Sequence, residues 1–239
     1  DVVVDAPTGT AGIFVDAEGR NSIVVGPGAN AALAPDDIAG RADTIAAAAV
    51  VLAQLESPVD AFTEALRLAR AHGATTLLNP APANVIAPAA LLGLTDIATP
   101  NETEFAALVA AHLGESLPGD AVATLADDVL HAHCRALLPG GTVVVTLGAA
   151  GCFVSHGAAR RGDDDACYRL PAPHADAIDT TGAGDAFNGA LAASLAMAPG
   201  WAFRAHAAFA GRYASHSTER PGAALAMPTR LEVEARFPA

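Results

Sequence analysis

Lysine is absent from this sequence, so arginine and histidine are its only basic side chains. A P-loop needs a lysine to reach the phosphates, and a Schiff base forms on a lysine amine, so the sequence excludes both. The 13 basic residues are outnumbered by 26 acidic ones, which gives a net charge of −13. Such a surface repels polyanions, and we therefore expect neither a nucleic acid nor an anionic membrane as a partner.

Cysteine is also scarce, and Cys134, Cys152 and Cys167 form no CxxC pair. We expect reduced, buried thiols in a cytoplasmic protein. No apolar run reaches the roughly 20 residues of a membrane helix, and no signal-peptide pattern opens the sequence. The 239 residues, 52% of them hydrophobic, suffice for one large core.

A glycine-rich turn over Asp179–Gly189 leads into an apolar helical run that ends at Met197. Gly182 and Gly184 carry no Cβ, so the backbone can wrap closely around an anion. The unpaired amides and the positive dipole end of the new helix favour phosphate. Asp185 stands in that first turn, where it can complement the dipole or take a proton from a nucleophile aimed at the phosphate. The residues alone leave both interpretations open.

From Gly28 onward, short apolar runs alternate with helical segments, which predicts a mostly parallel sheet with helices on both faces. Before it, apolar runs at Ala11–Asp16 and Asn21–Val25 predict a β-hairpin, and Val2–Val4 a further strand. Such a hairpin is typical of a lid or a dimer contact, and a plain edge hairpin is an alternative of equal weight. We divide the chain into a partial β lid, 1–26, and an α/β domain, 27–239. Later strands are predicted over Val50–Leu55, Thr75–Leu78, Asp96–Ala98, Thr142–Leu147 and Cys152–Ser155, and helices over Ala61–Ala71, Phe105–Leu113, Ala121–Leu137, Ala186–Met197 and Trp201–Ser217.

Polar residues or glycines follow the carboxyl ends of the predicted strands, where ligands bind in open α/β sheets. Each has a structural alternative: Asn101 and Glu104, for example, stand at the spacing of a helix capping box. Their occurrence together with the anion-binding turn predicts one shared ligand site. These residues are Glu56, Asn79, Asn101, Glu104, Thr146, Gly148 and Gly151.

Two other polar clusters are predicted to be structural. His131 and His133 are separated by two positions, so on a helix they face different directions and make a poor metal site. Arg160–Asp165 is predicted to be a solvated loop, and its run of aspartates is not predicted to bind a cation.

Several segments resemble the ribokinase/phosphofructokinase-B-like sugar kinases over essentially the whole chain. Asp179–Gly189 is similar to the specific C-terminal signature of that family, Thr99–Glu104 to its metal and phosphate motif, and Thr146–Gly151 to its nucleotide loop. The resemblance implies a three-layer sandwich with a mostly parallel central sheet and a small β lid. Leu55–Pro58 and Asn79–Ala83 resemble the ribokinase branch more than the fructokinase or adenosine-kinase branches, and Gly28–Leu33 and Arg220–Ala223 also fit.

The resemblance implies ATP-dependent phosphorylation of D-ribose to D-ribose 5-phosphate. Asp185 would be the general base and contact the sugar, as would Glu56, and the amides of Gly182, Ala183 and Gly184 would hold the transferring phosphoryl group. Asn101 and Glu104 would organise Mg²⁺ through water. The nucleotide would be bordered by Asn101, Thr146, Leu147, Gly148, Ala149, Ala150, Gly151, Gly184 and Gly211, and a monovalent cation such as K⁺ by Asp179, Thr181, His216, Glu219 and Gly222.

The sequence departs from the family pattern at three positions. Gly211 stands where a histidine or asparagine is usual near the adenine, and Ala226 replaces a serine near the monovalent cation, where Glu219 is also atypical. Whether that cation is required therefore stays open.

The sequence also starts within the lid of the family. The first strands and the Gly-Gly sugar cradle lie outside it, and a polypeptide that began at Asp1 would lack half of the sugar site. If the full chain is present, we expect a homodimer through the lid. Two alternatives stay open: another sugar or nucleoside kinase of the family, and a truncated, catalytically inert relative that binds nucleotide.

Overall fold

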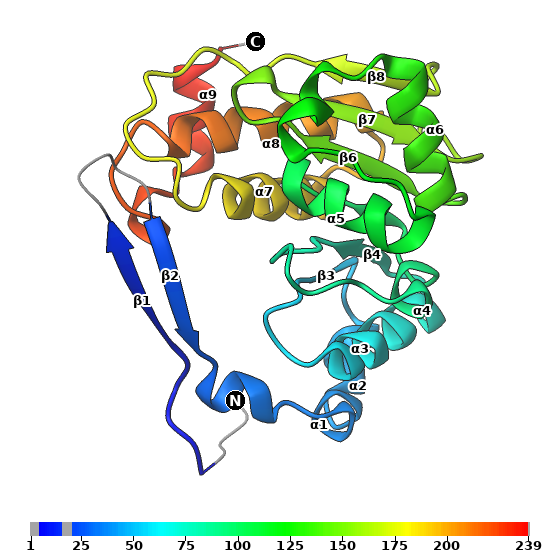
Figure 1. Cartoon of the computed structure of the whole chain (residues 1–239), viewed down its shortest axis with the longest axis vertical. Helices are drawn as coiled ribbons and strands as arrows, with labels where there is room; N and C mark the ends of the chain where they lie inside the picture. The colour runs from blue at the N-terminus through cyan, green and yellow to red at the C-terminus, as the bar shows by residue number, and fades with distance from the viewer. Residues whose placement is uncertain (1–4, 16–20, 239) are drawn as a thin grey trace.

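The computed structural model describes residues 5–15 and 21–238 and contains two separate β-sheets (Figure 1). A two-stranded sheet pairs β1 with β2, and a six-stranded sheet has the order β3-β4-β5-β6-β7-β8. The strands are β1 (Thr10–Val15), β2 (Asn21–Gly26), β3 (Val50–Ala53), β4 (Thr75–Leu78), β5 (Ile97–Ala98), β6 (Thr142–Thr146), β7 (Cys152–His156) and β8 (Cys167–Leu170). The helices are α1 (Pro35–Ala39), α2 (Ala42–Ala46), α3 (Val59–Ala71), α4 (Ala89–Leu92), α5 (Glu102–Leu113), α6 (Asp127–Leu137), α7 (Ala183–Met197), α8 (Phe203–Ser217) and α9 (Arg230–Arg236).

The central sheet is parallel from β3 to β6 and antiparallel from β6 to β8. The change of direction follows from chain length. Helical segments join the parallel strands, whereas only Leu147–Gly151 connects β6 to β7, which is too short for a parallel crossover. The strands predicted for this sheet are confirmed: β3, β5 and β6 are slightly shorter than predicted, β4 has the predicted bounds, and β7 is one residue longer. Strand β8 is an addition that the sequence pattern did not indicate.

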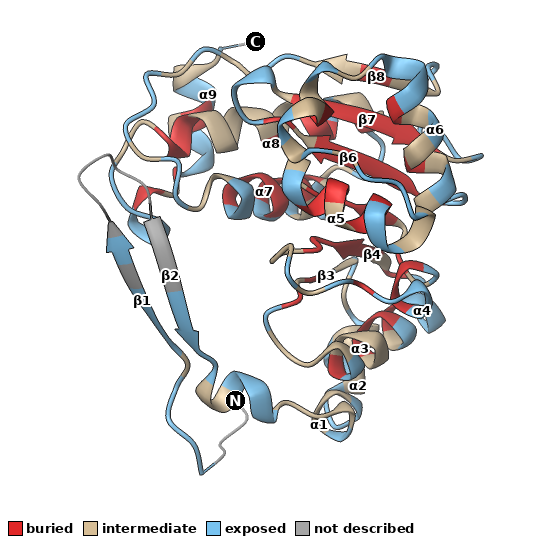
Figure 2. Cartoon of the chain, viewed as in Figure 1, coloured by how far each residue is buried: buried red, intermediate tan, exposed pale blue. Residues whose placement is uncertain are grey.

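Alternate residues of the strands pack against opposite helical layers. Val144 of β6 belongs to the core cluster formed with α7 and α8, whereas its neighbours Val143 and Val145 belong to the cluster formed with α5 and α6. This is the two-residue period of a strand that is buried on both faces. A third cluster lies where α3 and α4 cover β3 and β4. Figure 2 shows the buried strands between the helices, which confirms the predicted three-layer α/β sandwich.

The predicted hairpin is present as β1 and β2, an antiparallel pair that projects from the body of the protein (Figure 1). Its register pairs Thr10 with Gly26 and Val15 with Asn21. Phe14, Val24 and Val25 are 64–65% exposed, so this ribbon displays apolar side chains. The connecting turn, 16–20, and the strand predicted at Val2–Val4 lie outside the described residues.

The single long helix predicted over Ala121–Leu137 is wrong. The chain forms a short 3₁₀ helix over Gly119–Thr124, becomes extended at Leu125 and Ala126, and starts α6 at Asp127. The cause lies in β8: the guanidinium of Arg169 donates to the carbonyls of Ala123 at 3.0 Å and Leu125 at 2.8 Å. These carbonyls are bonded to the arginine where a continuous helix would use them for its own amides.

The prediction of a solvated loop over Arg160–Asp165 is wrong for Asp163, whose side chain is 2% exposed. Its Oδ2 lies 3.0 Å from Nε2 of His156 and accepts a hydrogen bond from the hydroxyl of Tyr168 at 2.5 Å. Its Oδ1 accepts from the amide of Arg204 at 3.0 Å. Asp163 therefore joins β7, β8 and the start of α8. Burial lowers the pKa of His156, which favours the neutral ring in this network.

The two histidines of α6 take separate partners. His131 Nδ1 lies 2.8 Å from the hydroxyl of Ser155, and His133 Nε2 lies 2.9 Å from the carboxylate of Glu115. Cys134 and Cys152 are buried thiols, and burial raises the pKa of each to about 12. Within 5–15 and 21–238, no helix combines the length and apolarity needed to cross a bilayer.

We expect Asp163→Ala to lower the free energy of unfolding by about 3 kcal/mol, because it leaves buried donors without their acceptor. The midpoint of urea unfolding measures this. Asp164→Ala is the matched control, since Asp164 is exposed in the same loop. Equal midpoint shifts for the two variants would contradict the structural importance of Asp163.

Candidate active site

The glycine-rich turn predicted from the sequence is present at the N-terminus of α7. α7 starts at Ala183, three residues earlier than predicted, so Asp185 is its third residue. Gly182 caps the helix with φ +79°, and a Cβ there would lie 3.0 Å from Cε of Met227. Glycine satisfies both the left-handed backbone and this close approach.

The first-turn amides of α7 differ in how they are bonded. Ala183 donates to the carbonyl of Thr180 at 3.2 Å, and Ala186 to that of Gly182 at 2.9 Å. Within the described residues, no hydrogen-bond acceptor is found for the amides of Gly184 and Asp185. The helix therefore starts with unpaired donors at its positive end, which suits an anion.

Asp185 is exposed at this turn, and its carboxylate contacts the end of another strand. The side-chain amide of Gln54, directly after β3, donates to Oδ1 of Asp185 at 3.1 Å. The same Nε2 donates to Oδ1 of Asn79, directly after β4, at 2.9 Å. Asn79 in turn donates to the carbonyl of Thr99 at 2.9 Å. The carboxyl ends of these strands thus meet the start of α7, as the sheet topology predicts.

A second contact ties α7 to the sheet one turn later. The buried hydroxyl of Thr99, directly after β5, donates to Oδ1 of Asn188 at 2.6 Å. The sequence pattern does not single out Gln54 or Asn188 as functional residues. A signal for each was nevertheless present: Gln54 is the only glutamine of the chain, and Asn188 interrupts an apolar helix.

Asn101 and Glu104 form the capping box of α5. Asn101 Oδ1 accepts from the amide of Glu104 at 2.8 Å, and the amide and side chain of Asn101 donate to the two oxygens of Glu104, each at 2.9 Å. The two residues therefore cap α5, as their capping-box spacing predicts. Burial raises the pKa of Glu104. One carboxylate beside one amide also fits Mg²⁺, which keeps waters and takes its remaining ligands from phosphates. The described residues hold no cluster of three histidine, cysteine or acidic ligands.

The predicted nucleotide loop lies beside Asn101. The amide of Thr146 donates to the carbonyl of Pro100 at 2.9 Å, and a parallel bridge links Thr146 to Asn101. A 3₁₀ turn over Gly148–Ala150 is exposed, while the side chain of Leu147 is buried. Gly151 closes the loop with φ +91°, and a Cβ there would collide with the carbonyl oxygen of Leu170.

Two further predicted residues stand apart from these contacts. Glu56 is exposed in the turn between β3 and α3, two residues beyond Gln54, and thus at the same sheet edge as Asp185. Gly211 lies in α8, where an added Cβ would approach only Cδ of Pro173, at 4.0 Å. The position of Gly211 consequently offers open space.

The structure brings the five predicted monovalent-cation residues into two adjacent segments, 178–182 and 216–222. Ile178 donates to the carbonyl of Thr218 at 2.7 Å, which pairs the segments. The carboxylate of Asp179 accepts from the amides of Thr181 at 2.9 Å and Gly222 at 2.8 Å. Hydrogen bonds from Thr181 and from Gly222 lower the pKa of Asp179 to about 2.

Glu219 belongs to the second of these segments and has protein partners. It accepts from Arg236 of α9 at 2.8 Å, and His216 Nδ1 lies 2.7 Å from its other oxygen. Arg236, followed by His216, lowers the pKa of Glu219 to about 2. Both acids are therefore bonded to donors of the protein, and backbone carbonyls would supply much of any cation coordination here.

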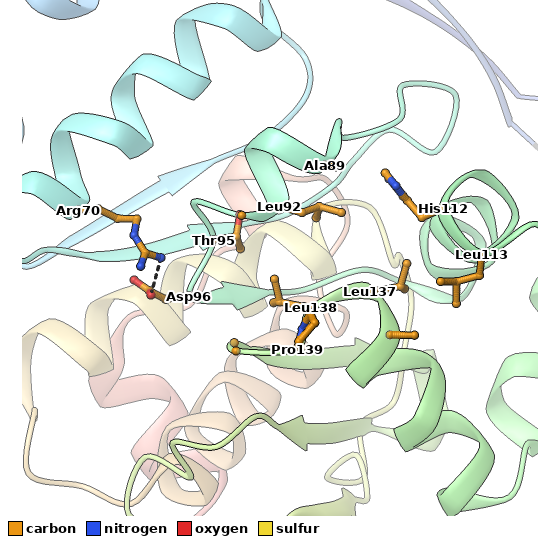
Figure 3. Close-up of a pocket in the computed structure, with 14 residues that line it drawn as sticks. Arg70, Ala89, Leu92, Thr95, Asp96, His112, Leu113, Leu137, Leu138 and Pro139 are labelled. Carbon is orange, nitrogen blue, oxygen red and sulfur yellow. Dashed lines mark hydrogen bonds and ion pairs between the residues drawn. The ribbon is translucent and has the colours of Figure 1, made fainter.

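A cavity of about 470 Å³ lies elsewhere, at the amino ends of β5 and β6 (Figure 3). On one side of the cavity, the guanidinium of Arg70 lies 3.1 Å from the carboxylate of Asp96. On the other side lie His112 and Leu113 of α5. No residue that the sequence predicts for the ligand site lines this cavity. The residues predicted for the ligand site therefore lie at the opposite edge of the sheet from this cavity.

The lowered pKa of Glu219 predicts a stabilising contribution that depends on pH. Because the folded pKa is about 2 and the ordinary value is 4.5, the contribution is present above about pH 4.5 and is lost as the pH falls toward 2. We expect the difference in urea midpoint between the wild type and Glu219→Gln to be largest above pH 5 and to shrink on acidification. Glu234→Gln, which removes an exposed ion pair with Arg230, should give a smaller difference. A difference that does not change with pH would contradict this assignment.

Comparison with known proteins relates the whole described site to one family. A model of the pfkB family carbohydrate kinases matches residues 1–230. The ribokinase of Staphylococcus aureus (strain COL) is 39% identical over 191 residues, which are 80% of this chain and 57% of that protein. A bifunctional ribokinase/ribose-5-phosphate isomerase A of Fructilactobacillus sanfranciscensis is 38% identical over 232 residues, which are 95% of this chain and 38% of that protein.

Solved structures give the same relationship. Ribokinase from Thermotoga maritima is 31% identical, with a TM-score of 0.79 over 97% of this chain and 70% of that one. Arabidopsis thaliana ribokinase, complexed with ribose and ATP, is 26% identical, with a TM-score of 0.80 over 97% of this chain and 69% of that one. Since the family model accounts for residues 1–230, the chain belongs to the pfkB family of carbohydrate kinases.

Proposed function

We propose that the protein transfers the γ-phosphoryl group of ATP to D-ribose and releases D-ribose 5-phosphate and ADP. The observation that carries this proposal is the position of Asp185, a carboxylate beside unpaired amides at the start of α7 and at the carboxyl ends of the strands. The similarity to ribokinases supports the choice of substrate. The chain spans about half of the length of the curated ribokinase of Staphylococcus aureus, so the activity is proposed for the full-length polypeptide.

The proposed reaction at this turn moves one proton, forms one bond to phosphorus and breaks another. Asp185 takes the proton of the sugar hydroxyl, the hydroxyl oxygen bonds to the γ-phosphorus, and the bond from phosphorus to the bridging oxygen of ADP breaks. The amides of Gly182 and Gly184, with the dipole of α7, stabilise the charge on the transferring group. The amide of Ala183 contributes while it also donates to the carbonyl of Thr180 at 3.2 Å. These groups belong to a packed helix, so little reorganisation accompanies the reaction.

Other residues of this edge position the two substrates. Glu56 binds the sugar, while the loop Thr146–Gly151 and Gly211 border the nucleotide. Asn101 and Glu104 would organise Mg²⁺ through water, and the ion would neutralise phosphate charge. A monovalent cation such as K⁺ would be held near Asp179, with Thr181, His216, Glu219 and Gly222 around it, and would shape the anion-binding turn.

Two alternatives have different experimental signatures. One is another sugar or nucleoside kinase: a deoxyribokinase of Salmonella typhi is 34% identical over 187 residues, and the solved adenosine kinase of Sinorhizobium meliloti is 26% identical. The other is an inert relative that binds nucleotide. ADP formation with D-ribose, 2-deoxy-D-ribose, D-fructose and adenosine separates them. The proposal requires D-ribose to give the highest kcat/KM, and ADP binding without turnover of any acceptor would support the inert alternative.

We further propose that the protein is a cytoplasmic homodimer and that residues 1–26 form a lid through which two copies associate. The exposed apolar side chains of Phe14 and Val24, which the strand register places on one face of the ribbon, support this assignment, because exposed apolar patches mark interaction sites. Val24→Asp should shift the sedimentation coefficient of the full-length protein from dimer to monomer. An unchanged dimer would place the contact elsewhere.

Asp185→Asn should lower kcat for D-ribose by about 10²–10⁴-fold, because the amide cannot accept the hydroxyl proton. This is roughly 3–5 kcal/mol in activation free energy. Steady-state kinetics, with the melting temperature as a folding control, measure the effect. Asp127→Asn changes a first-turn acid of α6 that pairs with Arg169 and should keep the activity. Near-normal turnover of Asp185→Asn would remove Asp185 from the mechanism.

A further inference from the structure

We infer that Gln54 is a positioning residue that fixes the orientation of Asp185, an inference that rests on the proposed function. Gln54 belongs to a series of hydrogen bonds that connects two residues of α7, Asp185 and Asn188. The links run through Asn79 and Thr99, so that the ends of three neighbouring strands, β3, β4 and β5, all take part.

The geometry of Gln54 leaves its side-chain amide little freedom. A glutamine amide has two N–H donors, and both have acceptors here: Asn79 Oδ1 at 2.9 Å and Asp185 Oδ1 at 3.1 Å. Asn79 is itself held, since it is 7% exposed and donates to the carbonyl of Thr99 at 2.9 Å. The buried contact with Asn79 therefore directs the second N–H of Gln54 toward the carboxylate.

This contact distinguishes the two oxygens of Asp185. Gln54 occupies Oδ1, whereas within residues 5–15 and 21–238 Oδ2 has no hydrogen-bond donor. Because Asp185 is exposed, water could satisfy its carboxylate without Gln54, so the bond is not required to compensate for burial. Its consequence is orientation: Oδ2 is presented to the substrate hydroxyl while Oδ1 is anchored.

The hydrogen bond between Thr99 and Asn188 fixes the position of the N-terminal turns of α7. Thr99, 1% exposed, donates to Asn188 at 2.6 Å, and Asn188 follows Asp185 by three residues on the same helix face. The base and the anion-binding amides are therefore held to the sheet at two points. Displacements of about 1 Å at reacting groups cost up to about 10²-fold in rate, so this anchoring has a kinetic consequence.

The first test replaces Gln54 by methionine, which keeps the length of the side chain and removes its donors. In the full-length protein, Gln54→Met should lower kcat by about 10–10²-fold and leave KM for ATP within about twofold, because the nucleotide loop is not touched. Glu64→Gln is the control, since that residue of α3 forms an ion pair with the exposed Arg67 of the same helix. A higher KM for ATP with unchanged kcat would overturn the inference.

Gln54→Glu adds a readout that a purely structural role would not change. An ionised glutamate has no proton to donate to Asp185, whereas a protonated one donates from its carboxyl group, and proximity of two carboxylates favours retention of one proton. The ratio of kcat for Gln54→Glu to wild type should therefore rise as the pH falls from about 8 to about 5.5. For Gln54→Met the ratio should stay flat. If the kcat ratio to wild type depended on pH in the same way for both variants, positioning through a donated hydrogen bond would be contradicted.

The last experiment separates this inference from the proposed function. In an Asp185→Asn background, Gln54→Met should cause little further loss of kcat, and losses that multiply would show that Gln54 acts independently of Asp185. If the wild type phosphorylates no sugar, the proposed function fails, and the contact is tested by NMR of the Gln54 side-chain amide. Its signals should shift in Asp185→Asn and not in Asp127→Asn. If the side-chain amide signals of Gln54 do not shift in Asp185→Asn, the inference is overturned.

Discussion

The attachment of α7 to the carboxyl edge of the central sheet is the constraint on which the rest of the site depends. The helix start offers unpaired amides, but these bind an anion usefully only when they are held at a fixed distance from the other substrate. Phe187 and Leu191 anchor one face of α7 in the core beside β4, β5 and β6. Gly182 permits the left-handed turn in front of it, and the polar chain through Gln54 and Thr99 fixes its register.

The polar residues of this edge combine a structural and a functional role. The hydrogen bonds that make Asn101 and Glu104 a helix cap also hold both side chains in place at the site proposed for Mg²⁺. The same holds for Asn79, whose buried bonds order Gln54. A capping or turn interpretation therefore does not compete with a binding interpretation, because the cap orders the side chains before a ligand arrives.

The distribution of charge is compatible with the polyanionic nucleotide of the proposed reaction. The net charge of −13 opposes such a ligand at long range. Near α7, the acids Asp179 and Glu219 are bonded to amides, to Arg236 and to His216, so their charge is compensated locally. Backbone donors at the helix start then act at short range, where their direction matters more than the charge of the whole molecule.

The sequence by itself determined the features that depend on neighbouring residues. It placed the strands β3 to β7, the glycine turn before α7, the cap of α5 and the polar strand ends, because each follows from local periodicity, glycine conformation or capping spacing. The tertiary structure decided the features whose partners are distant in the chain. Gln54 and Asp185 are 131 residues apart, and Arg169 interrupts a helical segment from 44 residues away. Asp163 likewise became buried through His156, Tyr168 and Arg204. Such contacts arise from the stacking of layers, which local sequence patterns do not record.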